Sequence, residues 1–309
     1  MMKKITIVGA GRVGEATAQA LANGDMAQQI VLLDIREGAA DGAALDVQET
    51  APIFGFDAKV TGSTDNREMR DSNLVIITAG FPRKPGMSRS DVLEANLAII
   101  DQVVDNVLQY APDSMLLLVS NPVDALTYRA WKRTGWSRER VFGQAGVLDS
   151  TRMASFVAME TGFSVKDINA MVLGGHGDTM VPMCRYTTVN GIPIDQFLSA
   201  ESIDKIVERT RKGGAEILAL RKHSSAYDAP AAAVAAMVDA ISVNRKRLLP
   251  CVSILQGEYG LNNIAMGVPV VMGQRGLERV VELTLNDTEQ KMFDETIATI
   301  KSDLEKIPE

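Results

Sequence analysis

Cysteine, histidine and long apolar runs are scarce in this 309-residue sequence, and each scarcity excludes a class of protein. Two cysteines and two histidines are too few for a disulfide scaffold and show no metal-ligand spacing. No apolar run approaches the roughly 20 residues of a membrane helix. Basic residues are scattered and the formal net charge is -7. We therefore expect no metal, no membrane partner and no nucleic-acid partner.

The beginning of the sequence and the cysteine content both favour a cytoplasmic location. Two lysines precede the apolar run ITIV at 5–8, which is far too short for the apolar region of a secretory signal. Two thiols without a disulfide framework suit a reducing compartment.

Short apolar runs alternate with helical patterns over residues 1–143. The runs are rich in Ile, Val and Leu without polar alternation, as in strands buried on both faces, and lie at 5–8, 30–33, 58–61, 74–78, 115–120 and 140–143. The helices expected between them lie at about 13–23, 38–50, 91–110 and 123–134. This alternation predicts an α/β fold with an N-terminal doubly wound parallel sheet of the Rossmann type.

Residues 144–309 have a mixed pattern that predicts a C-terminal α+β domain, packed tightly against the first. Asn190-Gly191 interrupts a run of period 2, which is a strong hairpin signal. Helices are expected at about 149–161, 201–221, 228–243 and from 287, with strands at 168–173, 250–256 and 264–272. The alanine-rich helix at 228–243 suits either a subunit face or the core.

A glycine pattern lies between the first expected strand and the next helix. Gly9, Gly11 and Gly14 have the spacing G-x-G-x-x-G, which serves a tight turn, close approach to a pyrophosphate, and helix packing. Asp34 ends the second strand, where an acid can accept hydrogen bonds from ribose hydroxyls and repel a 2′-phosphate. We predict a dinucleotide site that prefers NAD to NADP, a preference that the nearby Arg36 softens.

Charged residues stand at two further places where a ligand crevice is expected. Asp149 and Arg152 are spaced i and i+3, so they share a helix face as a local ion pair or as part of a site. The segment at 80–91 follows the fourth strand and contains Arg83 and Arg89. These arginines suit anion clamps on a movable loop, although a basic surface loop would have the same composition.

Asn121 and His176 are two further candidate site residues. Asn121 follows the fifth strand and suits either a helix cap or a ligand contact. His176 stands among glycines in LGGHGDTM, and its ordinary pKa near 6.5 suits proton transfer near neutrality. We expect the glycines to let ligands approach it closely. A lone histidine is more often a surface or core residue, and this remains our interpretation of His223.

Six motifs, in this order and spacing, make the sequence resemble the lactate and malate dehydrogenase family along essentially its whole length. They are VGAGRVG, LLDI, GFPRKPGMSR, VSNPVD, GQAGVLDSTR and GGHGD. Within that family the sequence looks most like the bacterial malate dehydrogenases built on the lactate dehydrogenase plan. The resemblance implies NAD-dependent, reversible hydride transfer on a 2-hydroxy acid, a role in the tricarboxylic acid cycle, and a homodimer or homotetramer.

The resemblance also implies roles for individual residues. His176 would be the proton donor and acceptor, Asp149 would orient it, and Arg89 would polarise the reacting carbonyl. The implied substrate-binding residues are Arg83, Arg89, Asn121, Arg152 and Ser225, with Arg152 on the α-carboxylate. The implied cofactor-binding residues are Gly9, Ala10, Gly11, Arg12, Val13, Gly14, Asp34, Asn96, Val119 and Asn121.

Arg83 favours malate and oxaloacetate as the substrates. Two carboxylates need two clamps, and Arg83 is left over once Arg152 and Arg89 have their roles. A guanidinium buried against the methyl group of pyruvate would have no anion, which is costly. In lactate dehydrogenases the matching position usually holds glutamine, and in the malate enzymes it holds arginine. The alternatives are an L-lactate dehydrogenase and a catalytically silent NAD-binding sensor.

Overall fold

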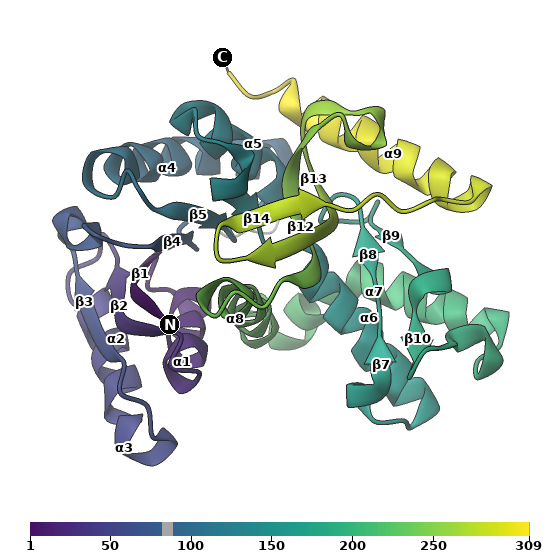
Figure 1. Ribbon diagram of the computed structural model, residues 1–309, viewed down its shortest axis with the longest axis horizontal. Coiled ribbons are helices and arrows are strands. Elements are labelled where there is room, and N and C mark those ends of the chain that lie inside the picture. The colour runs from purple at the N-terminus through teal and green to yellow at the C-terminus, as the bar shows by residue number, and fades with distance from the viewer. Residues whose placement is uncertain (82–88, 309) are drawn as a thin grey trace.

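A single large sheet organises the molecule. The structure is a computed structural model that describes residues 1–81 and 89–308; the side chains of residues 89 and 90 also lie outside the description. Among the described residues this sheet has nine strands in the order β14-β13-β12-β6-β5-β4-β1-β2-β3 (Figure 1). Its parallel part consists of β1 Met2–Val8, β2 Ala27–Leu33, β3 Lys59–Ser63, β4 Leu74–Ile77, β5 Met115–Leu118 and β6 Val141–Gly143.

Helices cover both faces of this parallel part, as a doubly wound sheet requires. In Figure 1, α1 and α2 lie on one side and α4 and α5 on the other. The bounds of the helices are α1 Arg12–Asn23, α2 Ala39–Glu49, α3 Ala51–Phe54, α4 Arg89–Tyr110 and α5 Val123–Thr134. The predicted fold class is therefore confirmed.

The strands lack polar alternation because each is buried on both faces. In β2, Ile30 and Leu32 belong to the core cluster under α1 and α2, whereas Val31 and Leu33 belong to the cluster under α4 and α5. Successive strand residues point to opposite faces, so a strand between two helical layers needs apolar residues at every position. Continuous apolar runs in the sequence follow directly from this arrangement.

The second half of the chain contributes both to the large sheet and to a smaller lobe. Strands β12 Arg247–Gln256, β13 Asn262–Gly273 and β14 Gly276–Val280 extend the sheet in antiparallel order. The other elements are α6 Gly146–Thr161, β7 Ile168–Asn169, β8 Val172–Leu173, β9 Val181–Pro182, β10 Thr188–Val189, β11 Ile192–Pro193, α7 Ala200–Arg221, α8 Asp228–Ser242 and α9 Asp287–Leu304. Because the sheet continues across it, the division into 1–143 and 144–309 remains a proposal.

Local signals predicted most of these elements, with a few differences. The hairpin at Asn190-Gly191 is present between β10 and β11, and both turn residues have positive φ. The single strand expected at 168–173 is two short strands that pair with different partners, β7 with β10 and β8 with β9. The short α3 and the edge strand β14 were not expected.

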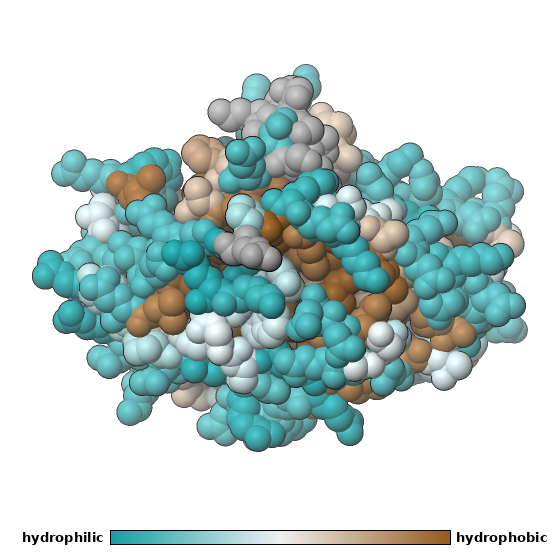
Figure 2. All heavy atoms as spheres, turned by 90° about the horizontal axis from the view of Figure 1, so that it is seen from above, coloured by the Kyte–Doolittle hydropathy of each residue, from teal (hydrophilic) through white to brown (hydrophobic). Residues whose placement is uncertain are grey.

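The alanine-rich helix α8 belongs to the core of this chain rather than to an exposed face. Val234, Met237 and Val238 are completely buried and join the cluster that contains α1. On the face that carries α4, α5 and α9, hydrophilic residues cover most of the surface and hydrophobic residues gather in a band near its middle (Figure 2).

Candidate active site

The residues expected at the cofactor follow the carboxyl ends of neighbouring strands. Gly9 comes directly after β1, Asp34 directly after β2, and Val119 directly after β5, two residues before Asn121. Parallel strands place these ends at one edge of the sheet, where ligands of doubly wound folds bind. The glycine loop follows β1, which lies between β4 and β2, and the chain order reverses there. The fold therefore brings these candidates to one edge of the sheet, the place where a ligand crevice is expected.

The three glycines of the loop have different surroundings. Gly9 has a φ of +106°, and a Cβ there would lie 2.7 Å from the backbone nitrogen of Ala79. A Cβ on Gly14 would lie 1.9 Å from the carbonyl oxygen of Gly9, so α1 needs a glycine to pack against the loop. A Cβ on Gly11 would meet no atom within 4 Å, because Gly11 faces open space at the beginning of α1. This open helix N-terminus fits a diphosphate.

Asp34 is anchored by hydrogen bonds on both sides of its carboxylate. Its Oδ2 accepts from the backbone nitrogen of Ala10 at 2.9 Å, and its Oδ1 accepts from the backbone and side chain of Arg36. Burial alone would raise the pKa of Asp34, but the hydrogen bonds from Arg36 and Ala10 outweigh it and lower the pKa. Asp34 therefore carries a charge at the site expected for the ribose, with an exposed arginine paired to it.

Asn96 is occupied by backbone contacts within the protein. Its side chain accepts from the backbone nitrogen of Phe81 at 2.7 Å and donates to the carbonyl oxygen of Asn121 at 2.7 Å. It joins α4 to two strand-end segments at the crevice, which places it beside the expected cofactor site. Arg83 lies outside the described residues. Arg89 begins α4, and its side chain lies outside the description as well.

A histidine, a carboxylate and a guanidinium form a connected group in the second half of the chain. The Nδ1 of His176 lies 2.8 Å from Oδ2 of Asp149, and Nη1 of Arg152 donates to Oδ1 of the same carboxylate at 3.2 Å. The side chains of Asp149, Arg152 and His176 are 2%, 11% and 17% exposed. The spacing of Asp149 and Arg152 on α6 therefore does place them together, and the His176 loop meets them.

Burial and charge act in opposite directions on the imidazole. Burial lowers the pKa of His176, but the charge and hydrogen bond of Asp149 raise it and prevail, so the pKa lies above its ordinary value. Arg152 opposes this change and Asp124 adds to it. With Nδ1 directed at Asp149, Nε2 is the ring atom left for proton exchange with a ligand.

The glycines before His176 pack the loop against its neighbours, a role that the sequence did not predict; the approach of ligands to His176 stays a prediction. Gly174 exchanges two backbone hydrogen bonds with Gly267 on β13, and Gly175 donates to the hydroxyl of Thr296 on α9 at 2.9 Å. Gly174 has a φ of +85°, and a Cβ there would lie 3.0 Å from Thr296. The loop is held by the sheet and by α9.

Arg152 has hydrogen-bonding capacity to spare for an anion. Among the described residues, no atom accepts a hydrogen bond from its buried Nε. Its side chain runs along α7, where a Cβ on Gly213 would lie 3.1 Å from Cδ and 3.4 Å from Nε. A buried cation with unused donors suits a carboxylate ligand. Gly213 was not predicted from the sequence, since its role depends on contact between two helices.

Ser225 lies on the connection between α7 and α8, and a ring stack places this connection next to the glycine loop. The guanidinium of Arg12 lies over the ring of Tyr227, 5.5 Å from its centre, and that of Arg221 lies 4.1 Å from the same centre. Tyr227 is two residues after Ser225, so the segment lies next to the glycine loop. Cation–π contacts of this kind have no signature in sequence spacing.

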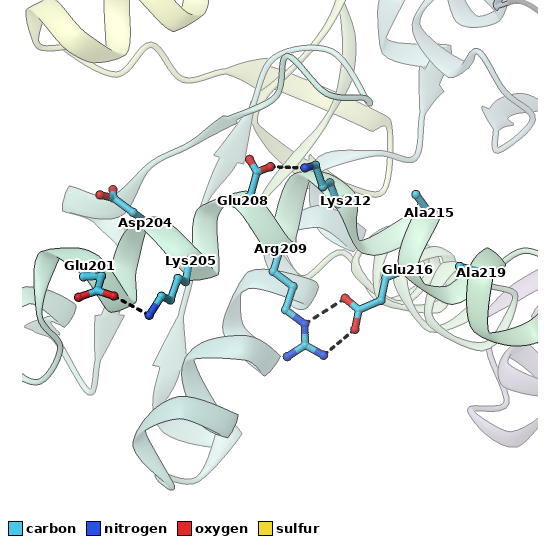
Figure 3. Close-up of a pocket in the computed structure, with 9 residues that line it drawn as sticks. All are labelled: Glu201, Asp204, Lys205, Glu208, Arg209, Lys212, Ala215, Glu216 and Ala219. Atoms are coloured by element: carbon cyan, nitrogen blue, oxygen red, sulfur yellow. Dashed lines mark hydrogen bonds and ion pairs between the residues drawn. The ribbon is translucent and has the colours of Figure 1, made fainter.

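A hollow of about 700 Å³ along α7 is separate from this group. Charged residues from one side of the helix line it and pair with one another, as Figure 3 shows: Lys205 with Glu201, Lys212 with Glu208, and Arg209 with Glu216. Paired, exposed charges of this kind form an ordinary solvated helix face. Gly213, which contacts Arg152, also lies on α7 but does not line this hollow.

Two kinds of feature are absent from the described residues. No described helix has the length and apolar character needed to cross a membrane. No group of three or more His, Cys, Asp or Glu side chains in the described part of the chain is placed to hold a metal ion.

A glycine loop and an anchored acid at the strand ends, together with a buried carboxylate, imidazole and guanidinium, are typical of a nicotinamide-dependent dehydrogenase of small acids. The family model for the NAD binding domain of lactate/malate dehydrogenase matches residues 3–143, and the model for the alpha/beta C-terminal domain matches residues 146–309. The chain belongs to the lactate/malate dehydrogenase family.

Individual relatives match over nearly the whole chain. A malate dehydrogenase of Thioalkalivibrio sulfidiphilus is 66% identical over 99% of this chain and 100% of its own length. One of Pseudomonas putida is 54% identical and covers 99% of both chains. Among solved structures, malate dehydrogenase from Picrophilus torridus in its apo form has a TM-score of 0.95 at 41% identity, covering 99% of this chain and 97% of its own. Lactate dehydrogenase from Cryptosporidium parvum, complexed with lactic acid and NAD, has a TM-score of 0.94 at 36% identity, covering 99% of this chain and 98% of its own.

Proposed function

We propose that this chain is an NAD-dependent malate dehydrogenase that interconverts malate and oxaloacetate. The observation that carries the proposal is the connected group of His176, Asp149 and Arg152, in a fold that also contains the glycine loop and Asp34. The name carried by relatives with 54 to 66% identity supports malate as the substrate. NAD supplies the chemistry of hydride acceptance when it is bound.

Each residue of the group has a task that its contacts suit. His176 would accept the hydroxyl proton of malate at Nε2 and return it to the oxygen of oxaloacetate. Asp149 holds the ring through Nδ1 and stabilises its protonated form. Arg152 would bind the α-carboxylate with the donors that the protein leaves unused. Arg89 would offset negative charge on the reacting oxygen.

The remaining proposed contacts concern orientation and the cofactor. Asn121 and Ser225 would contact the substrate from the strand end and the α7–α8 connection. The other proposed residues would hold the cofactor: Gly9, Ala10, Gly11, Arg12, Val13, Gly14, Asp34, Asn96, Val119 and Asn121. The open space at Gly11 and the anchored carboxylate of Asp34 are the features that fit it.

An assay of the purified protein tests this function. NADH absorbance is followed after addition of oxaloacetate or pyruvate, and kcat/KM for oxaloacetate should be the larger by at least tenfold. Preference for pyruvate would mean a lactate dehydrogenase. The fold allows this alternative, because the lactate dehydrogenase from Cryptosporidium parvum has a similar fold. Binding of NADH without oxidation by either acid would mean a sensor.

Arg83 offers a direct test of substrate choice. Arg83→Gln should lower kcat/KM for oxaloacetate on the order of 30-fold or more, since losing one partner of a buried charged pair costs about 2–5 kcal/mol. Pyruvate should gain, because its methyl group no longer faces a cation. Arg89→Gln is the matched control and should slow both acids. An equal loss for both acids in Arg83→Gln would remove Arg83 as the specificity residue.

We also propose that the protein assembles as a homodimer or homotetramer. Leu45 on α2 and the adjacent residues Ile53 and Phe54 on α3 expose large apolar side chains, and Ile53 is 83% exposed. Sedimentation equilibrium should give two or four chains per particle, and Ile53→Glu should lower that number. A monomer at micromolar concentration would contradict the proposal.

A cytoplasmic location is the last part of the proposal. Cys184 and Cys251 are both free thiols, which suits a reducing compartment. Cell fractionation followed by immunoblotting should find the protein with cytoplasmic markers, and recovery with periplasmic markers would contradict this.

A further inference from the structure

Asp124 is a buried acid to which the proposed mechanism gives no task. It is the last residue of VSNPVD, stands in the first turn of α5, and is 3% exposed. Burying a carboxylate is costly unless its charge is compensated. The positive end of the helix dipole at the beginning of α5 gives part of that compensation.

The contact of Asp124 leads to the histidine loop. Its Oδ2 accepts a hydrogen bond of 3.0 Å from the backbone nitrogen of His176, across 52 residues of sequence. Asn121 precedes Asp124 by three residues at the same helix beginning. We infer that Asp124 is a positioning residue of this active site, which ties the His176 loop to the helix beginning that carries Asn121.

The charge of Asp124 also bears on the proton of the ring. Among the described residues, the charged groups that act on the imidazole are Asp149 and Arg152 on α6 and Asp124 on α5. In the described part of the chain, α9 and β13 meet the loop through Thr296 and Gly267, which are uncharged. Asp124 acts with Asp149 to hold the pKa of His176 above its ordinary value, although Asp149 is the larger influence.

Substitutions can separate the two effects of Asp124, its hydrogen bond to the His176 loop and its negative charge. Asp124→Asn keeps an oxygen that can accept from the His176 nitrogen but removes the charge. Asp124→Ala removes both. Asp101→Asn is the matched control, because Asp101 on α4 pairs with Arg129 on the same helix α5 without touching the histidine loop.

The two histidines of the chain make the first measurement simple. His176 and His223 give two sets of ring signals in the NMR spectrum of protein labelled only in histidine, and His223→Gln assigns them. Asp124→Asn should move the His176 titration midpoint to lower pH, while Asp101→Asn leaves it at the wild-type value. An unmoved midpoint, or an equal movement in the control, overturns the influence of the charge.

Kinetics tests the positioning, which rests on the proposed function. Asp124→Ala should lower kcat for oxaloacetate reduction by about 10 to 100-fold, the cost of a small misplacement, while the Kd for NADH, measured by fluorescence, stays within about twofold. Asp124→Asn should retain most of the wild-type kcat when the pH is below the His176 titration midpoint of that variant. A wild type inactive on oxaloacetate would refute the proposed function alone, since the NMR and exchange measurements need no turnover.

Hydrogen exchange gives a reading that needs no substitution. The His176 amide of the wild-type protein should exchange far more slowly than amides of exposed loop residues, because Asp124 accepts its hydrogen. Exchange at the rate of an exposed loop would overturn the inference even if the variants fail to fold.

Discussion

Gly213 offers a test of how closely α7 is fitted to Arg152. Gly213 is buried in the middle of α7, and a Cβ there would lie 3.1 Å from Cδ and 3.4 Å from Nε of Arg152. Gly214 follows it in the same helix, but its Cβ would lie 3.8 Å from Arg152, an ordinary contact. Gly213→Ala and Gly214→Ala therefore form a matched pair: the new methyl group is too close to the Arg152 side chain in the first variant and makes an ordinary contact in the second.

The magnitudes follow from two opposing effects. Alanine favours an interior helix position over glycine by roughly 0.8–1 kcal/mol, so Gly214→Ala should raise the free energy of unfolding by about that amount. Gly213→Ala gains the same helix preference but must displace Arg152 by a few tenths of an ångström. Loss of one hydrogen bond to a charged group costs about 1.5–3 kcal/mol, which corresponds to a tenfold or larger fall in kcat/KM.

Steady-state kinetics and thermal unfolding distinguish the two variants. Gly213→Ala should raise KM for oxaloacetate about tenfold or more, with the Kd for NADH unchanged, while Gly214→Ala keeps wild-type kinetics and melts at a higher temperature. If both variants keep the wild-type KM, Arg152 does not bind the substrate in the position described. If both raise it equally, the effect belongs to the helix and not to Arg152.

Three further predictions address individual charges. Asp149→Asn should lower the pKa of His176, so the pH above which oxaloacetate reduction falls should move down; a pH profile of kcat/KM that stays in place would exclude the pairing as its cause. Asp34→Ser should raise the ratio of NADP to NAD use, because it releases Arg36 to bind the 2′-phosphate. The double variant with Arg36→Ala lacks that guanidinium and should lose much of the rise. Equal ratios in the single and double variants would contradict this. A side-chain hydrogen bond from Arg138 lowers the pKa of Glu258 to about 2, so its contribution to stability is present above its ordinary pKa near 4.5 and is lost as pH falls toward 2. Glu258→Gln should therefore show a smaller loss of unfolding free energy than wild type between pH 5 and pH 2 in denaturant titrations, and identical slopes would argue against it.

The fold was largely predictable because its signals are local. Strands buried on both faces require apolar residues at every position, and the turn at Asn190-Gly191 requires residues that tolerate positive φ. What the pattern could not show is pairing between distant segments. Strand β12 joins β6 through a single residue pair, Val252 with Gly143, and no periodicity indicates that the sheet continues into the second half of the chain.

In the candidate site, too, the sequence predicted contacts within one helix but not contacts between distant segments. Asp149 and Arg152 are three residues apart on one helix, and their contact follows from spacing. The contact between Asp124 and His176 depends on how α5 meets the β8–β9 loop, and no local pattern carries it. The packing of the glycines before His176 against Thr296 on α9 also joins distant segments, so the sequence pattern did not indicate it.

The charges around His176 link proton binding to substrate binding. Asp149 and Asp124 favour the protonated ring, while burial and the charge of Arg152 oppose it. A substrate carboxylate on Arg152 would offset that opposing charge and so raise the affinity of the ring for its proton. By reciprocity, the protonated ring favours binding of the acid. If Arg152 binds the substrate as proposed, an oxo acid should therefore bind best to the form of the site in which His176 already carries its proton.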